Sequence, residues 1–234
     1  MNWVFNNLDL ILELSIQHLR LSIPPIVIGF LISIPLGYLA YRFNFTRGLL
    51  LTVAGLLYTI PSLALFVILP PLLGISFLSE LNIVIGLTIY AVAIMARSVA
   101  DALESVDPAI RQSATAVGFG SWRRFWVVEF PQAGPVILAG LRVTAVSTVS
   151  LVTVGSLIGI QSLGYLFTNG LARQILAEVF AGLIMVVVIA LLLDALLSLV
   201  GRWLMPWAPR RTKVSKVEIQ PGVHVETQGL GVQS

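Results

Sequence analysis

The sequence predicts an all-α integral membrane protein with five helical spans. Hydrophobic residues make up 57% of the 234 residues and charged residues only 11%, whereas a soluble domain carries about 25% charged residues. Five apolar segments are long enough to cross a hydrocarbon core of about 30 Å. A single long polar interruption, residues 106–135, separates the third segment from the fourth. A soluble fold is therefore excluded.

The elements follow in chain order. The first twenty residues carry Asp9 and Glu13 and lack the cationic start of a cleavable signal peptide, so residues 1–20 should form an extracytoplasmic N-terminal segment. The transmembrane region should cover residues 21–207, with spans over 21–41, 50–72, 81–100, 135–158 and 179–203. Pro24, Pro25 and Pro35 predict kinks in the first span. The polar, glycine-rich residues 208–234 predict a disordered cytoplasmic tail.

Positive charge predicts the orientation of these spans. If the amino terminus is outside, only Arg20 and Arg173 lie on the outer side, and twelve Lys or Arg residues lie on the cytoplasmic side. The twelve are Arg42, Arg47, Arg97, Arg111, Arg123, Arg124, Arg142, Arg202, Arg210, Arg211, Lys213 and Lys216. This distribution places both the 106–135 loop and the carboxyl terminus in the cytoplasm.

The net charge and the absence of cysteine exclude further classes. The formal net charge of +3 comes from the residues after Val200, where five Lys or Arg residues face two Glu residues. A basic tail beside the membrane explains this charge, and it argues against nucleic-acid binding. Without cysteine the chain has neither a disulfide framework nor a thiol nucleophile.

The 106–135 loop predicts two short helices joined by a glycine turn. Asp107 and Pro108 favour a helix start, because the carboxylate can accept from first-turn amides and proline needs no donor there. Gly118-Phe119-Gly120 should turn the chain sharply, with Ser121 as the N-cap of the second helix. Trp122, Phe125 and Trp126 recur at helical spacing and predict one aromatic face. Pro131 should end the unit, since proline disfavours the helical conformation in the preceding residue.

A family resemblance rests on this loop. Gln112-Ser113-Ala114, three residues, Gly118, nine residues, Val128, one residue and Phe130-Pro131 follow the spacing of the cytoplasmic loop in ABC importer permeases. That loop reads Glu-Ala-Ala, x3, Gly, x9, Ile, x, Leu-Pro. Gln-Ser replaces Glu-Ala here, so the salt bridge of the family's Glu is not available. The flanks IPSLALF and PVILAGLR resemble permeases of osmoprotectant importers.

The resemblance implies a five-span type I ABC importer permease (MetI-like) fold with a cytoplasmic coupling-helix loop. It implies a prokaryotic plasma membrane and an import function for glycine betaine, choline, carnitine or proline. The implied partners are a second permease, identical or similar, two ATPase subunits and an extracytoplasmic substrate-binding protein. ATP and Mg would lie on the partner ATPase, because residues 1–212 contain no lysine for a phosphate-binding loop.

The resemblance also implies which residues of the loop contact the ATPase. These residues are Gln112, Ser113, Ala114, Gly118, Phe119, Gly120, Ser121, Trp122 and Pro131. Small residues in the loop permit close approach, and exposed aromatic residues are common anchors at interfaces. The alternative for Trp122 and Trp126 is an aromatic belt at the membrane interface.

Polar residues within the spans suggest a translocation path and an ion pair. The candidate path residues are Tyr58, Ser62, Tyr90, Thr144, Ser147 and Thr148. Tyrosine rings can hold a quaternary ammonium group, but small residues in a span also mark close helix packing. Asp194 should pair with Arg142, or with Arg97 as the alternative, either as a fixed structural pair or as a gate.

A permease subunit for another small solute is an alternative, and two other functional classes remain open. A gradient-driven transporter or channel subunit would need coupling carboxylates near the membrane midplane, where Asp194 stands alone. A membrane scaffold would leave the patterned loop without a role. The sequence shows no catalytic constellation, and His18 and His224 lie too far apart in the sequence to suggest a metal site.

Overall fold

The computed structural model describes residues 2–207, and every regular element in that range is helical. In chain order these are α1 (Asn2–Asn6), α2 (Leu8–Arg42), α3 (Asn44–Thr59), α4 (Ser62–Leu73), α5 (Glu80–Glu104), α6 (Pro108–Ala116), α7 (Ser121–Arg124), the π-helix η1 (Phe125–Glu129), α8 (Phe130–Val152), the 3₁₀ helix η2 (Thr153–Ile158), α9 (Gly164–Ala172) and α10 (Leu176–Leu204). The predicted tail, residues 208–234, lies outside the described residues.

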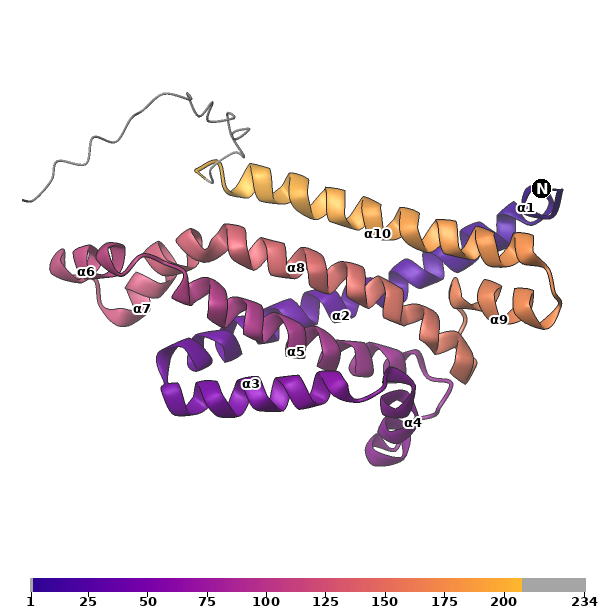
Figure 1. Cartoon of the computed structure of the whole chain (residues 1–234), viewed down its shortest axis with the longest axis horizontal. Coiled ribbons are helices and arrows are strands. Elements are labelled where there is room, and N and C mark those ends of the chain that lie inside the picture. The colour runs from indigo at the N-terminus through magenta and orange to yellow at the C-terminus, as the bar shows by residue number, and fades with distance from the viewer. Residues whose placement is uncertain (1, 208–234) are drawn as a thin grey trace, which may run out of the picture.

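Four helical segments are long and apolar enough to cross a membrane, and they contain four of the five predicted spans. They run over Leu8–Arg42, Glu80–Glu104, Ser121–Ile158 and Leu176–Leu204. Figure 1 shows the long helices side by side, with α6 and α7 at one end of the bundle and α9 and the N-terminus at the other. The loop singled out by the sequence therefore lies at one end of a helical membrane bundle.

The first long helix begins much earlier than the first predicted span. α2 starts at Leu8, so most of the segment expected before the membrane is helical. Ile11 and Leu14 are buried in one apolar cluster with Leu163 and Ala181, from α9 and its approach and from α10. This burial continues the helix toward the N-terminus. The three prolines of α2 lie inside one unbroken helix.

The second predicted span is not one continuous helix, which corrects the expectation for residues 50–72. α3 ends at Thr59, α4 begins at Ser62, and the two helices meet at 103°. Ile60 is extended, with φ −64° and ψ 127°, because the ring of Pro61 disfavours the helical conformation in the residue before it. The Tyr90 hydroxyl donates to the Ile60 carbonyl oxygen exposed by this break. The bent pair counts as a fifth span only if its two halves cross together.

The core of the bundle is α2 packed on α5 and α5 packed on α8, at positions where glycine allows close approach. A Cβ added at Gly29 of α2 would lie 2.5 Å from the Cβ of Ala91 in α5, and one at Gly140 of α8 would lie 2.5 Å from the Cβ of Ser98. Small residues serve the same purpose at helix contacts within membranes generally. In the fourth predicted span, Gly140 is therefore a packing position.

This packing predicts opposite effects for one substitution at two helical glycines. Gly29→Ala should lower the free energy of unfolding by about 1–3 kcal/mol, since the added methyl overpacks the contact with α5. Gly55→Ala in α3 meets no atom within 4 Å and should be neutral or slightly stabilising, because alanine favours helix over glycine. Thermal unfolding of both variants in the same detergent checks this. Equal shifts of the unfolding midpoint in the two variants would contradict the close contact of α2 with α5 at Gly29.

Candidate functional site: the loop between α5 and α8

The loop begins with a capped helix, as predicted. The Asp107 carboxylate accepts from the backbone N–H of Ala109 at 2.8 Å, and Pro108 occupies the first turn of α6. The cap removes one of the unpaired donors at the helix start. α6 is amphipathic and short, and its buried residue is Ala114, while Gln112 and Ser113 are exposed.

A glycine turn joins α6 to α7, and the backbone conformation requires glycine at position 118 but not at position 120. Gly118 has φ +92°, a left-handed conformation that side chains with a Cβ rarely adopt. The N–H of Gly118 donates to the Thr115 carbonyl at 3.0 Å, and that of Phe119 donates to the Ala114 carbonyl at 3.1 Å. These bonds close the end of α6. Gly120 has φ −66° and an open environment, so its side of the turn is not strained.

The start of the second helix differs from the expectation by one residue. Gly120, not Ser121, is the N-cap of α7, and its carbonyl accepts from the N–H of Arg124 at 2.8 Å. Ser121 is the first residue inside the helix and is exposed. The serine hydroxyl is therefore available at the surface of the loop instead of being used in a cap.

Pro131 does not end the loop, which corrects a second expectation. The chain is helical without interruption from Ser121 through the π-helical turn η1 into α8, and Phe130 keeps helical angles of φ −63° and ψ −46°. The π-turn shifts the hydrogen-bond pattern just before the proline, whose ring has no N–H to contribute. The second helix of the loop and the fourth predicted span are thus one helical segment.

Phe125 fixes this segment to the bundle. Its ring is 2% exposed and lies in an apolar cluster with Met95, Val99 and Ile137 from α5 and α8. The ring centroid of Tyr38 in α2 is 4.5 Å away. An aromatic side chain buried in this way contributes strongly to packing, so the loop is held by the spans and not merely tethered to them.

A second brace is polar and lies beside Phe125. Arg124 donates from Nε to Oε1 of the buried Glu129 at 2.6 Å and from Nη1 to the hydroxyl of Thr115 at 2.8 Å. Through Arg124 of α7, these two bonds join α6 to the end of η1. Sequence reasoning did not find this brace, because the five-residue spacing of Arg124 and Glu129 brings the two side chains together only through the π-turn.

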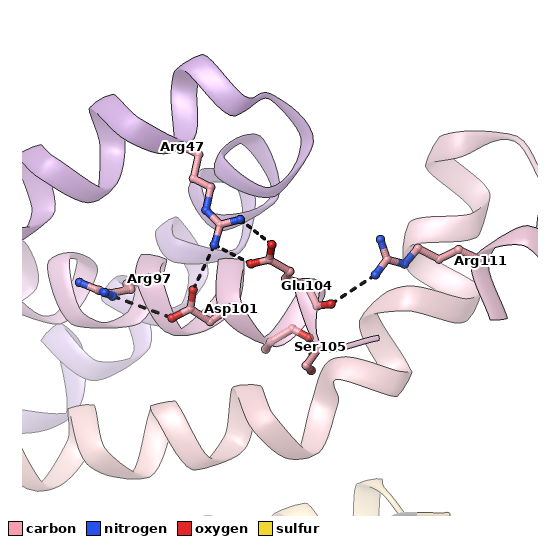
Figure 2. A network of polar contacts seen from close by, with 7 residues as sticks. Arg47, Arg97, Asp101, Glu104, Ser105 and Arg111 are labelled. Atoms are coloured by element: carbon pink, nitrogen blue, oxygen red, sulfur yellow. Dashed lines mark hydrogen bonds and ion pairs between the residues drawn. The ribbon is translucent and has the colours of Figure 1, made fainter. Parts of the chain in front are cut away.

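Arg111 connects α6 to the end of α2 and the end of α5. Its guanidinium donates to the Tyr41 hydroxyl at 2.6 Å and to the backbone carbonyls of Glu104, at 3.3 Å, and Val106. Figure 2 shows the Arg111 guanidinium reaching Glu104, whose carboxylate turns away to receive both terminal nitrogens of Arg47 in α3. Nη2 of Arg47 also lies 3.8 Å from Oδ1 of Asp101. Four helices, α2, α3, α5 and α6, therefore meet in one polar network at the base of the loop.

The outward surface of the loop contains most of the predicted contact residues. Trp122 is 68% exposed and Trp126 is 43% exposed. A Cβ at Gly118 or Gly120 would meet nothing within 4 Å. Ala114 is buried and supports α6 from below. The loop thus offers a firm surface of small and aromatic residues, of the kind that protein interfaces use.

A second candidate site lies in the bundle, where four of the six predicted path residues meet. Tyr58, Ser62, Tyr90 and Ser147 line an open groove of about 490 Å³ at the break between α3 and α4. The rings of Tyr58 and Tyr90 stand edge to face with centroids 6.1 Å apart. Aromatic rings beside hydroxyl groups suit a small cationic or zwitterionic solute.

The two remaining path candidates lie elsewhere. Thr144 and Thr148 are buried, and each hydroxyl donates to the carbonyl four residues earlier in α8, at 2.9 and 2.8 Å. The Thr144 hydroxyl also lies 3.8 Å from the sulfur of Met95 in α5, and neither threonine lines the groove. The spacing of these residues along α8 did not allow the sequence to distinguish residues that pack against other helices from residues that line the groove.

Asp194 of α10 and Arg142 of α8 form the expected pair. Nε and Nη2 of Arg142 donate to the two carboxylate oxygens of Asp194, each at 2.6 Å. A two-pronged pair of this kind has fixed geometry. Arg97, the alternative partner, instead has its Nε 3.9 Å from Oδ2 of Asp101, one helical turn along α5. The role of the Arg142–Asp194 pair, structural or gating, stays a prediction.

Comparison with known proteins points in one direction. A family model described as binding-protein-dependent transport system inner membrane component matches residues 29–209. The osmoprotectant import permease protein OsmW of Salmonella typhimurium is 31% identical over 198 residues, covering 84% of this chain and 92% of that protein. The carnitine transport permease protein OpuCB of Listeria monocytogenes is 30% identical over 197 residues, covering 84% and 89%.

The fold has a solved counterpart. A chain of the MetNI methionine ABC transporter in an inward-facing conformation superposes with a TM-score of 0.71 at 20% sequence identity. The match covers 88% of this chain and 99% of the other. At this identity the likeness concerns the arrangement of helices and says nothing of the solute.

The Arg142–Asp194 pair gives a prediction that separates its two roles. If the pair is structural, Asp194→Asn should lower the free energy of unfolding by about 1–3 kcal/mol, since it removes the charge that Arg142 binds. Adding Arg142→Gln should then cost little more, because the two effects share one interaction. Thermal unfolding of the single and double variants measures this. A gate would instead leave stability near normal and make ATP hydrolysis independent of substrate.

Proposed function

Because this chain belongs to the family of inner membrane components of binding-protein-dependent transport systems, we propose that it is the permease subunit of an ATP-driven importer of compatible solutes. The resemblance predicted from the loop is confirmed at the level of the family. The chain is a transport subunit and not itself an enzyme. The solutes proposed are glycine betaine, choline, carnitine or proline.

Two observations support this class of solute. Relatives that match most of the chain are named for osmoprotectant and carnitine import. Carnitine, choline and glycine betaine carry a quaternary ammonium group, which favours aromatic ring faces. Tyr58 and Tyr90 supply two rings to the groove at the α3–α4 break, with Ser62 and Ser147 beside them. We therefore assign this groove to the translocation path, and Thr144 and Thr148 to helix packing.

The observation that carries the proposal is the mechanical continuity of the loop with the spans. The segment from Ser121 to Ile158 is helical throughout, and Phe125 and Arg124 fix its start to the neighbouring helices. A rigid helix moves as a unit, so a displacement imposed on the outer surface of the loop would be passed into α8. In the proposed mechanism an ATPase subunit imposes that displacement when it closes around ATP and Mg.

The proposed assembly follows from the same considerations. Four or five spans leave one side of the groove open in the single chain, so a second permease, identical or similar, would complete the pathway. Two ATPase subunits would dock on the two loops, and an extracytoplasmic binding protein would deliver the solute. The chain is a multi-pass membrane protein; we propose a prokaryotic plasma membrane with the amino terminus outside and the loop in the cytoplasm, in line with the positive-inside rule.

The structure weakens the alternative of a gradient-driven transporter. Such a mechanism needs a carboxylate free to bind a coupling ion near the midplane. Both carboxylate oxygens of Asp194 accept hydrogen bonds from Arg142. The carboxylate that suggested this alternative is thus already bound by an internal cation.

The coupling role predicts that Gly120→Asp abolishes transport without unfolding the chain. Gly120 has ordinary backbone angles and open surroundings, so aspartate should be tolerated by the fold but should block close approach of another protein. Uptake of glycine betaine by proteoliposomes containing the permease, its ATPase and its binding protein should fall at least tenfold. Gly48→Asp, at an equally open glycine of α3, is the matched control and should keep transport.

Gly118→Asp should give a mixed result, because φ +92° adds backbone strain to any loss of docking. If Gly120→Asp transports as well as the control, the loop does not dock through its glycine turn. If none of the four compatible solutes enters with the unaltered complex, the solute class is wrong while the loop assignment stands.

The proposed orientation predicts a labelling pattern in intact cells. Because the chain has no cysteine, a single introduced thiol has no background. Ser76 is exposed in the connection from α4 to α5, and Arg173 is exposed directly after α9, the helix at the end of the bundle opposite α6 and α7 (Figure 1). Ser76→Cys and Arg173→Cys should react with a membrane-impermeant reagent. Ser121→Cys should react only after the cells are opened. Labelling of Ser121→Cys in intact cells would reverse the orientation.

A further inference from the structure

A polar cleft of about 380 Å³ lies where the last turn of α2 meets the loop. Its wall carries three arginines from three helices, Arg42 of α2, Arg111 of α6 and Arg124 of α7, and one carboxylate, that of Glu129. Three guanidinium groups beside one carboxylate leave an excess of two positive charges. An anion entering the cleft would therefore be attracted by more than one side chain.

The Arg111 guanidinium forms no ion pair within the part of the chain that the structure describes. Its hydrogen bonds go to neutral oxygens, namely the Tyr41 hydroxyl and the backbone carbonyls of Glu104 and Val106. Two acids lie nearby along the chain. The Asp107 carboxylate caps α6 by accepting from the N–H of Ala109, and the Glu104 carboxylate is directed to Arg47 (Figure 2). The network at the base of the loop thus holds the Arg111 guanidinium in place but leaves its positive charge to act on the cleft.

The cleft also presents donors that have no acceptor among residues 2–207. Arg42 is exposed and makes neither a hydrogen bond nor an ion pair within that range; its guanidinium rests 5.7 Å from the ring centre of Phe43. The Tyr41 hydroxyl accepts from Arg111, so its own proton remains available. Arg124 uses Nε and Nη1 within the chain, which leaves Nη2. Several N–H and O–H groups can therefore converge on one anion.

We propose that this cleft binds a phosphate group, and that an anionic phospholipid headgroup supplies it. Guanidinium forks match phosphate oxygens in pairs. The cleft is lined by Tyr38, Tyr41 and Arg42, the last turn of a helix of membrane-spanning length, which is the depth of lipid headgroups. A single carboxylate from another protein would fill little of the volume and satisfy fewer of the donors.

Binding there would fix the loop relative to the spans. Arg42 belongs to α2, whereas Arg111 and Arg124 belong to the loop, so one phosphate would bridge the two. The bridge would add to the packing of Phe125 against Tyr38 across the same boundary. The inference rests on the cleft alone and does not require the proposed transport function.

The test is a lipid titration of the full-length chain in a neutral detergent. The midpoint of thermal unfolding is followed as dihexanoyl phosphatidylglycerol, dihexanoyl phosphatidylcholine or inorganic phosphate is added, since a ligand of the folded state raises the midpoint. The variants are Arg42→Gln, Arg42→Lys and the control Arg202→Gln, which removes an exposed arginine from α10. Arg42 braces no other element, so its replacement should not unfold the chain.

Phosphatidylglycerol should bind at least about tenfold more tightly than phosphatidylcholine, and Arg42→Gln should weaken it about tenfold, the effect of one lost charge-assisted hydrogen bond. Arg42→Lys should recover part of the loss, and Arg202→Gln should behave as the unaltered chain. If inorganic phosphate gives the same dependence on Arg42, the phosphate site stands and its source is soluble.

Three results would overturn the proposal. The first is equal affinity for the two lipids. The second is equal weakening by Arg42→Gln and Arg202→Gln. The third is no shift with any phosphate compound while Arg42→Gln weakens association with the ATPase, which would assign the cleft to a protein carboxylate.

Discussion

The burial of Phe125 is the interaction on which the organisation of this chain depends. It lies at the π-helical turn where the loop becomes α8, and it packs among residues of α2, α5 and α8. Without it, the helix that starts at Ser121 would leave the bundle as a free extension. Arg124 and the buried Glu129 form a partly buried ion pair at the same turn, so apolar packing and a charge pair hold the loop at one place. The rigidity that coupling needs is thus built from side chains of the loop itself.

The loop end and the middle of the bundle are held together by different interactions. At the loop end, arginines of four helices contact carbonyls, carboxylates and a tyrosine hydroxyl, so charge is concentrated where a span meets the membrane surface. In the middle, contacts are close and nearly apolar, because Gly29 and Gly140 let backbones approach. The break at Pro61 lies beside this middle region, because Tyr90, the neighbour of Ala91 in α5, donates to the Ile60 carbonyl that the break exposes. The polar groove therefore forms where the helical backbone is interrupted, as expected for irregular backbone in a membrane.

The sequence predicted the class of fold, four of the spans and the outline of the loop, because these depend on local patterns. Apolar length identifies a span, and Asp107 and Gly118 act through the backbone of their own turns. It failed at Pro61 and Pro131 in opposite ways, since proline permits either a break or a continued helix. At Pro131 a π-turn and the packing of Phe125 favour continuation, and neither can be read from spacing. The pair Arg142–Asp194 was predictable because a carboxylate in a span needs a partner. The contacts of Arg111 with Tyr41 and of Arg47 with Glu104 depend on tertiary placement and were not found.

The account makes the outer surface of the loop the place where the ATPase docks, and a photo-crosslinking amino acid tests this most directly. Placed at Gln112, which is exposed on α6, the crosslinker should capture the ATPase subunit in membranes that contain the whole complex. Placed at Arg173, at the opposite end of the bundle, it should not. Crosslinking from position 173 to the ATPase, with none from position 112, would contradict the account.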